Sequence, residues 1–145
     1  MEDVKKRWSY LSRPAMNDFL CCQPKEKQQR YLKQLSEREQ EVIALSLLTF
    51  YMQQGSFLQF FSQYSAVTNI ALRALGKIKA ELAETLLRQG YQILQPTLQN
   101  WPDCTMQELL HHLTETEKQQ LHQLNQAYLQ VESQIYLQAF RYYAG

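Results

Sequence analysis

Apolar residues recur every three or four positions along most of the chain, the spacing that places them on one face of an α-helix. Between residues 36 and 54 they are dense enough to cover most sides of a helix, which is typical of a central helix surrounded by others. No segment has a convincing strand pattern. We therefore predict an all-α fold, a single-domain helical bundle of mixed long and short helices. The expected helices cover residues 4–11, 16–22, 25–35 (a helix or a tether), 36–54, 56–64, 66–75, 77–94, 105–113 and 115–143, the last either continuous or broken near Asn125.

Start and stop signals support these boundaries. In a capping box, a Ser or Thr side chain accepts from an amide one turn on and a Glu reaches back. Three of them precede periodic apolar runs: Ser36-Glu37-Arg38-Glu39, Thr105-Met106-Gln107-Glu108 and Thr114-Glu115-Thr116-Glu117. Pro14 predicts a helix end before it, and Pro96, Trp101 and Pro102 predict a loop. Gly55 and Gly76 predict two further helix ends, since glycine takes the left-handed C-cap conformation without steric cost.

Length and composition suit one domain with a real core. The chain has 145 residues, of which 45% are hydrophobic. We expect one helical domain over 1–145, made of an N-terminal helical extension (1–35) and a core (36–145). Glycine and proline number 4 each, which argues against a sandwich or barrel with its many turns. The net charge of +1 argues against a strongly basic nucleic-acid binder and a strongly acidic decoy of nucleic acid.

The cysteines and the N-terminus indicate a cytoplasmic protein. Cys21, Cys22 and Cys104 do not form an even, widely spaced set, so we expect free thiols in a reducing compartment. The basic N-terminus is not followed by the apolar run of a signal peptide. The longest strongly apolar stretch, 42–52, is about half the length of a membrane span, so no membrane partner is expected.

Candidate chemistry is sparse, and we expect neither an enzyme nor a bound cofactor or metal. The one cluster with ligand-type side chains has poor spacing for a metal site, because its adjacent histidines point about 100° apart on a helix. It comprises Asp103, Cys104, His111, His112 and His122. No Ser-His-Asp or Cys-His arrangement, glycine-rich phosphate loop or isolated carboxylate pair is signalled.

The residues that follow the central helix resemble those of a known protein family. The run Gln54-Gly55-Ser56-Phe57-Leu58-Gln59-Phe60-Phe61-Ser62-Gln63 is followed by the short helix Ala71-Leu72-Arg73-Ala74-Leu75-Gly76 and an Ala/Leu-rich helix. This resembles the bacterial DNA-mimic-protein-like domain family, whose signature reads roughly Asn-Gly-Gly-Phe-x-Gln-[Tyr/Phe]-[Phe/Leu]-x-Asn. The segment Leu124-Asn125-x-x-Tyr128 looks like the family's Leu-Asp-x-x-Tyr. Gln54, Ser56 and Gln63 replace the first asparagine, the second glycine and the second asparagine.

The resemblance implies a helical protein that acts by binding another protein. DNA mimicry needs a large negative field, and this chain has 14 acidic against 15 basic residues. By our count, residues 1–38 carry about +4 and residues 103–145 about −3. We therefore expect a non-catalytic accessory protein that inhibits or modulates one partner, either a regulator or a toxin. The expected partner-binding residues are Gln54, Gly55, Ser56, Gln59 and Gln63, and a homodimer stays open.

Two other surface features leave alternatives open. A basic N-terminal segment, interleaved with Trp8, Tyr10, Tyr31 and several acids, favours a nucleic-acid-associated protein as the alternative function. Its cations are Lys5, Lys6, Arg7, Arg13, Lys25, Lys27, Arg30 and Lys33. Glutamines recur at helical spacing near the C-terminus, and this row is either a solvated face or a neutral surface for a partner protein. The row consists of Gln119, Gln123, Gln126, Gln130, Gln134 and Gln138.

Overall fold

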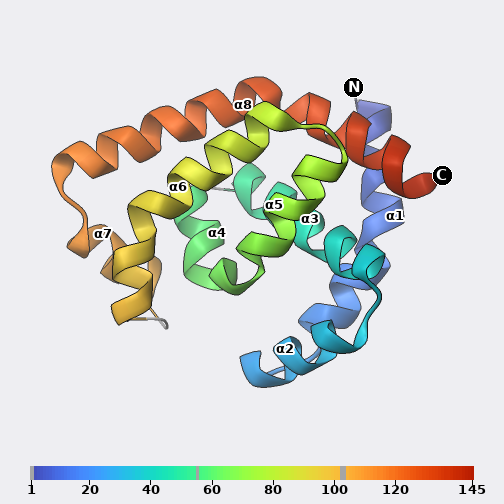
Figure 1. Ribbon diagram of the computed structural model, residues 1–145, viewed down its shortest axis with the longest axis horizontal. Helices are drawn as coiled ribbons and strands as arrows, with labels where there is room; N and C mark the ends of the chain where they lie inside the picture. Colours follow the sequence, from blue (N-terminus) through green and yellow to red (C-terminus); the bar gives the residue numbers. More distant parts are fainter. Residues whose placement is uncertain (1, 55, 102–103) are drawn as a thin grey trace.

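The fold is an all-helical bundle (Figure 1), seen in a computed structural model that describes residues 2–54, 56–101 and 104–145. Within these ranges the chain forms α-helices and one 3-10 turn and no strand, which confirms the predicted fold class. The elements are α1 (Glu2–Leu20), α2 (Lys25–Gln34), α3 (Glu37–Gln54), α4 (Phe57–Tyr64), η1 (Ser65–Val67), α5 (Thr68–Lys77), α6 (Glu81–Asn100), α7 (Met106–His112) and α8 (Glu115–Ala144).

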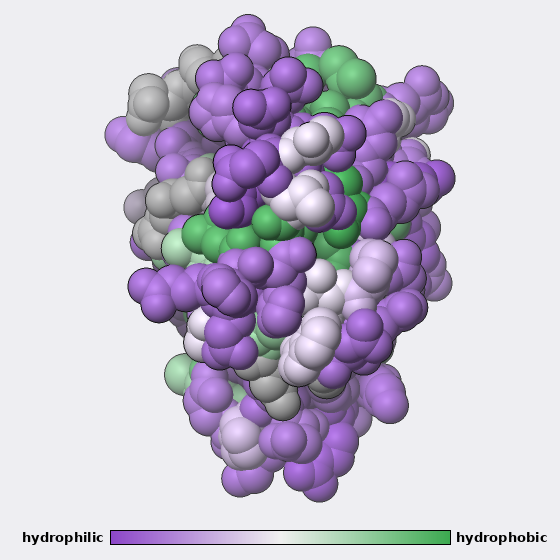
Figure 2. Space-filling view, turned by 90° about the vertical axis from the view of Figure 1, so that its left-hand side faces the viewer, coloured by the Kyte–Doolittle hydropathy of each residue, from purple (hydrophilic) through white to green (hydrophobic). Residues whose placement is uncertain are grey.

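The longest helix, α8, organises the outside of the bundle. It runs antiparallel to α6 along one edge, and α7 joins the two at one end (Figure 1). At the other end α8 packs on α1, so the two chain termini lie near each other, while α2 packs on α1 and projects away from α8. Seen from the α7 end, the surface is mostly hydrophilic with a hydrophobic band across its middle (Figure 2). No described helix combines the length and the apolar character needed to cross a membrane.

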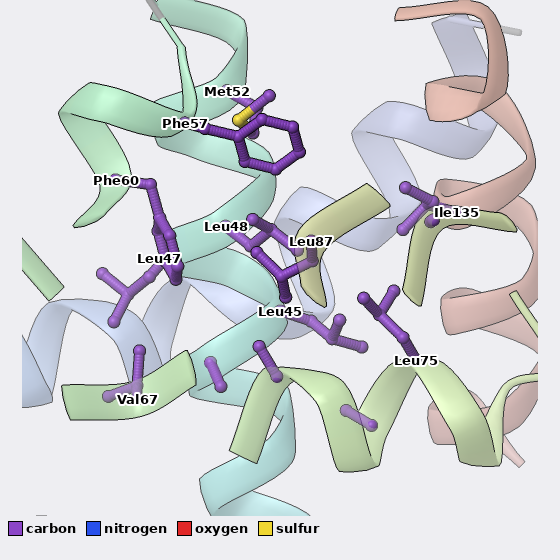
Figure 3. Packing of buried hydrophobic residues seen from close by; sticks show 14 of the residues in the cluster. Leu45, Leu47, Leu48, Met52, Phe57, Phe60, Val67, Leu75, Leu87 and Ile135 are labelled. Carbon is purple, nitrogen blue, oxygen red and sulfur yellow. The ribbon is translucent and has the colours of Figure 1, made fainter. Parts of the chain in front are cut away.

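The core is built around α3, as its dense apolar pattern predicts. Residues 41–49 are all buried, and α1, α4, α5 and α8 pack around this helix. Side chains of α3, α4, η1, α5, α6 and α8 meet there (Figure 3), and burying each large one contributes roughly 2 kcal/mol. Those labelled are Leu45, Leu47, Leu48, Met52, Phe57, Phe60, Val67, Leu75, Leu87 and Ile135.

Two prolines predicted to end helices do not do so. Residues 4–11 and 16–22 were expected as separate helices, but α1 is continuous through Pro14. The reason is the buried stripe of Trp8, Ser12, Met16 and Phe19, whose helical spacing continues past the exposed proline. In the same way α6 continues past the exposed Pro96 to Asn100, where a loop was expected after residue 94.

The α5–α6 junction also differs from the prediction. Gly76 lies inside α5, and the left-handed residue is Lys79, with φ of 63°. The Lys79 amide donates to the Gly76 carbonyl at 3.1 Å and the Ala80 amide to the Leu75 carbonyl at 2.9 Å, which is a Schellman motif. Ile78 and Ala80 are both buried, so the exposed residue between them takes the left-handed conformation.

The three predicted capping boxes all cap helices. The Ser36, Thr105 and Thr114 hydroxyl oxygens accept from the amides three residues on at 3.2, 3.2 and 3.1 Å. The reciprocal bond to the cap amide is made at Thr114, where Glu117 Oε1 accepts at 2.9 Å. The helix that follows is unbroken at Asn125, which settles the alternative left open there. The helix end expected at Gly55 lies outside the described residues.

Candidate functional site

The α3–α4 turn carries the predicted partner-binding residues. Gly55 and the side chain of Gln54 lie outside the described part of the chain. Ser56 is half-buried just before α4, Gln59 is half-buried one turn later, and Gln63 is exposed one turn beyond that. The opposite face of α4 is buried and carries the aromatic side chains. This helix is therefore an aromatic wedge, by which we mean that Phe57, Phe60 and Phe61 pack in the core while Gln59 and Gln63 line its accessible edge.

The segment of α8 that resembles the family pattern holds this turn in place. Ser56 makes no side-chain cap, and the Phe57 amide instead donates to Asn125 Oδ1 at 3.0 Å. The Phe57 ring meets the Tyr128 ring edge-on, with centroids 5.6 Å apart. Two segments that are 68 residues apart in the chain therefore fix the entry to α4 with one hydrogen bond and one aromatic contact.

A chain of hydrogen bonds links the C-terminal end of α3, next to the turn, to α8. Gln53 Nε2 donates to the Tyr136 hydroxyl, which donates to Glu132 Oε1 at 3.1 Å. Burial and the neighbouring Glu132 charge raise the pKa of Tyr136 above its ordinary value, so the hydroxyl stays protonated and serves as a donor. Gln53 thus links the turn to the region where α1, α3 and α8 meet.

A pocket of about 170 Å³ opens in that region, and we name it the α1–α3–α8 pocket. Its described lining residues are Lys5, Trp8, Ser9, Ser12, Arg13, Met16, Ser46, Thr49, Phe50, Gln53 and Tyr136. The hydroxyl donors of the floor are already used, since Ser12 donates to the Trp8 carbonyl and Ser46 to Met16 Sδ. Lys5 Nζ lies 5.9 Å from the centre of the Tyr136 ring, a cation–π contact at the rim.

A buried carboxylate network, not found from the sequence, joins α3 to α5 and α8. Glu41 has a side chain that is 1% exposed, and its oxygens lie 2.7 Å from Arg73 Nε and 2.7 Å from Lys77 Nζ. The Tyr143 hydroxyl donates to Glu41 at 2.8 Å, and Arg38 donates to the Tyr143 carbonyl. Burial opposes ionisation, but the three hydrogen bonds hold the pKa of Glu41 below its ordinary value. The network fastens the C-terminal end of α8 to α3 and α5.

The predicted glutamine row lies on one continuous face of α8. All its members are exposed except Gln138, which is half-buried. Nearby glutamines of α6 face those of α8 across a groove of about 550 Å³. Its described lining residues are Gln89, Gln92, Ile93, Gln120, Gln123, Leu124 and Ala127. The amides make this surface neutral and polar, and the structure leaves both interpretations of the row standing.

The histidine–cysteine cluster is dispersed at the α7 end of the molecule. His112 stacks on Trp101 with ring centroids 4.4 Å apart, and His122 contacts Gln126 at 3.1 Å. Cys104 is buried, and Asp103 lies outside the described residues. Among the residues that the structure describes, no three His, Cys, Asp or Glu side chains gather as a metal site requires. These histidines therefore make surface packing and hydrogen-bond contacts.

The cations of the N-terminal segment lie on α1 and α2. No ion pair joins any of them to another described side chain, and the same holds for Arg38, Lys79 and Arg141 elsewhere in the chain. All of them are exposed except Lys5, which is half-buried.

Together these features define an all-α protein with a buried aromatic wedge and polar edges. The chain belongs to the DMP19-like protein family, because the family model matches residues 33–144. This confirms the resemblance that the sequence carries. No curated protein and no solved structure matches the chain.

Proposed function

We propose that this protein is a non-catalytic binding protein that inhibits or modulates one partner protein, either a regulator or a toxin. Family membership supports the binding of a protein partner. The observation that carries the proposal is the start of α4, where Asn125 holds the Phe57 amide across 68 residues of sequence. A recognition edge fixed in this way loses little conformational entropy when a partner docks on it.

The amide side chains of α4 form the centre of the proposed interface. Gln59 and Gln63 lie one helical turn apart on the accessible edge of a helix whose other side is packed in the core. Each amide offers both donors and an acceptor, so this edge suits a polar protein surface. The overall charge balance argues against the strong negative field that a copy of duplex DNA would need.

Affinity capture followed by a binding measurement tests this proposal. The tagged full chain is used to capture proteins from the native cell lysate, and the captured protein is purified and titrated against the wild type. We expect Gln59→Lys and Gln63→Lys each to weaken binding at least about fivefold, or about 1 kcal/mol, as at a contributing interface residue. The matched control is Gln34→Lys, an exposed glutamine of α2.

Three outcomes would contradict the proposal. The first is capture of nothing but chaperones, and the second is equal weakening by the α4 variants and the α2 control. The third is loss of binding with Gln126→Lys and Gln130→Lys but not with the α4 variants, which would move the interface to the glutamine row.

The alternative is a nucleic-acid-associated protein that uses α1 and α2. The observation in its favour is that the cations of this segment take part in no described ion pair. Phosphate contacts are strongest at low salt, so a gel shift at about 50 mM salt is the test. Absence of binding there would end this alternative.

A further inference from the structure

The α1–α3–α8 pocket is lined by a residue whose buried hydrogen-bond donor has no partner among the described residues. Trp8 lines the pocket with only 2% of its surface exposed, and its indole Nε1 has no hydrogen-bond partner among the described residues. A buried N–H left unpaired costs roughly 1–3 kcal/mol, so native structures rarely keep one without a reason. A ligand acceptor that reached the indole edge from the pocket would supply that partner.

Two cations add further donors to the pocket. Lys5 and Arg13 line it, and neither takes part in an ion pair within the described chain. The described lining residues include no carboxylate. One indole N–H, one ammonium and one guanidinium together match a group that only accepts, and among protein side chains that group is an ionised carboxylate.

The neighbouring surface favours a carboxylate over a phosphate. Glu132 accepts from Tyr136, a lining residue, so a negative charge already stands beside the pocket. Its repulsion acts more strongly on a phosphate that carries close to two charges than on a carboxylate that carries one. The aromatic walls, Trp8, Phe50 and Tyr136, also suit the apolar stem of an acidic side chain.

The pocket continues into a larger surface on the outer side of α1. Ser9 and Arg13 line the pocket and also a hollow of about 750 Å³ that contains Lys6 and the 84% exposed Tyr10. Asp18 lies at the far end of this hollow and is its one described acid. A longer acidic chain could therefore place one carboxylate in the pocket and others along α1.

We propose that the α1–α3–α8 pocket binds a carboxylate group carried by an acidic segment of a partner protein. Trp8 Nε1 is the buried donor, and Lys5 and Arg13 are the cations. The proposal rests on the proposed function in taking the partner to be a protein, and Gln53 places the pocket beside the α3–α4 turn. It names the chemistry that such a partner must present.

The two tryptophans of the chain provide the test. The uniformly ¹⁵N-labelled full chain is titrated with a hexaglutamate peptide, and the two indole N–H signals are followed by NMR. We expect the Trp8 signal to shift and saturate, while the signal of Trp101, half-exposed and stacked on His112 at the end of α7, stays in place. Lys5→Gln and Arg13→Gln should each weaken binding about two- to fivefold, while Lys25→Gln on α2 should not.

A further variant separates the indole donor from ring packing. Trp8→Phe keeps an aromatic ring in the core and removes the N–H, and binding is then followed through the backbone amides of Ser9 and Gln53. We expect about tenfold weaker binding, the loss of one hydrogen bond to a charged group. Unchanged binding by a folded Trp8→Phe protein would show that the indole N–H does not take part in binding.

Three results would overturn the proposal. A Trp8 signal that does not respond to the peptide shows that the pocket takes no carboxylate. Tighter binding of a phosphoserine peptide of equal length at equal salt shows a phosphate site instead. A Trp8 shift on concentrating the protein alone shows that a second copy is the occupant. The titration uses no natural partner, so its failure and a failed capture experiment are distinguishable.

Discussion

Glu41 offers the sharpest test of how this bundle is held together. Its carboxylate is the meeting point of Arg73 and Lys77 from α5 and Tyr143 from α8, on a side chain that is 1% exposed. The Glu41→Gln substitution keeps the shape and one acceptor for Tyr143 but removes the charge. It therefore isolates the ion-pair contribution from packing.

The magnitude follows from the exposure of the partners. Breaking a fully buried ion pair costs about 3–5 kcal/mol because the remaining charge is stranded. Here the Arg73 and Lys77 side chains are 39% and 33% exposed, and Glu37 lies 3.5 Å from Arg73 and 2.6 Å from Lys77. Neither cation is stranded, so we expect Glu41→Gln to lower the free energy of unfolding by about 2 kcal/mol. Glu41→Ala also leaves the Tyr143 hydroxyl without its acceptor and should cost about 4 kcal/mol.

The pH dependence has a definite sign. The folded-state pKa of Glu41 is held below its ordinary value of about 4.3, so its stabilising contribution is complete above that pH. The contribution is lost as the pH falls through the lowered folded-state pKa. The gap in stability between wild type and Glu41→Gln should therefore narrow below about pH 4.

Urea unfolding followed by circular dichroism at pH 7 and pH 3 measures this gap. Glu37→Gln is the matched control, since its side chain is 60% exposed and its ion pairs should contribute less than about 1 kcal/mol. A Glu41→Gln protein within about 0.5 kcal/mol of wild type at pH 7, or a gap that does not change with pH, would refute the reasoning.

Three smaller predictions concern the helices. Asn125→Ala leaves the Phe57 amide without its acceptor and should cost about 1 kcal/mol in urea unfolding; an unchanged midpoint argues against the cap. Pro14→Ala restores an exposed backbone donor within α1 and should stabilise by about 2 kcal/mol, and a lower thermal midpoint would contradict this. In Gly90→Ala the new Cβ would lie 3.4 Å from the Phe61 ring, an ordinary contact. The gain in helix propensity should then stabilise by up to about 1 kcal/mol, measured by thermal unfolding, whereas Gly90→Leu should cost about 2 kcal/mol. A destabilising Gly90→Ala substitution would show that α6 and the Phe61 ring cannot move apart enough to accommodate the added methyl group.

The functional regions were only partly accessible to sequence reasoning. The family pattern located Phe57 in one segment and Asn125 and Tyr128 in another, but their contact exists only because α8 packs over the start of α4. Trp8 stood out only as an aromatic among N-terminal cations. Its N–H is buried, without a described hydrogen-bond partner, because α3 and α8 pack against α1.

The sequence contains a charge pattern that points to the Glu41 network. Glu37 and Glu41 are four residues apart, as are Arg73 and Lys77, so two helices each present a pair of like charges on one face. Like charges so spaced repel each other unless opposite charges face them, which makes such pairs candidates for mutual contact. Which pairs meet is a question of helix packing, and the pattern along either helix does not answer it.

The helical class, most of the helices and their N-terminal caps could be predicted from the amino-acid sequence alone. These depend on spacing within one helix and on hydrogen bonds over three or four residues, so the information is local. Tertiary structure decided whether Pro14 and Pro96 break a helix and which residue of the α5–α6 junction turns left-handed. In each case the burial of flanking side chains outweighs a local cost of about 1–3 kcal/mol, and that burial exists only in the assembled bundle.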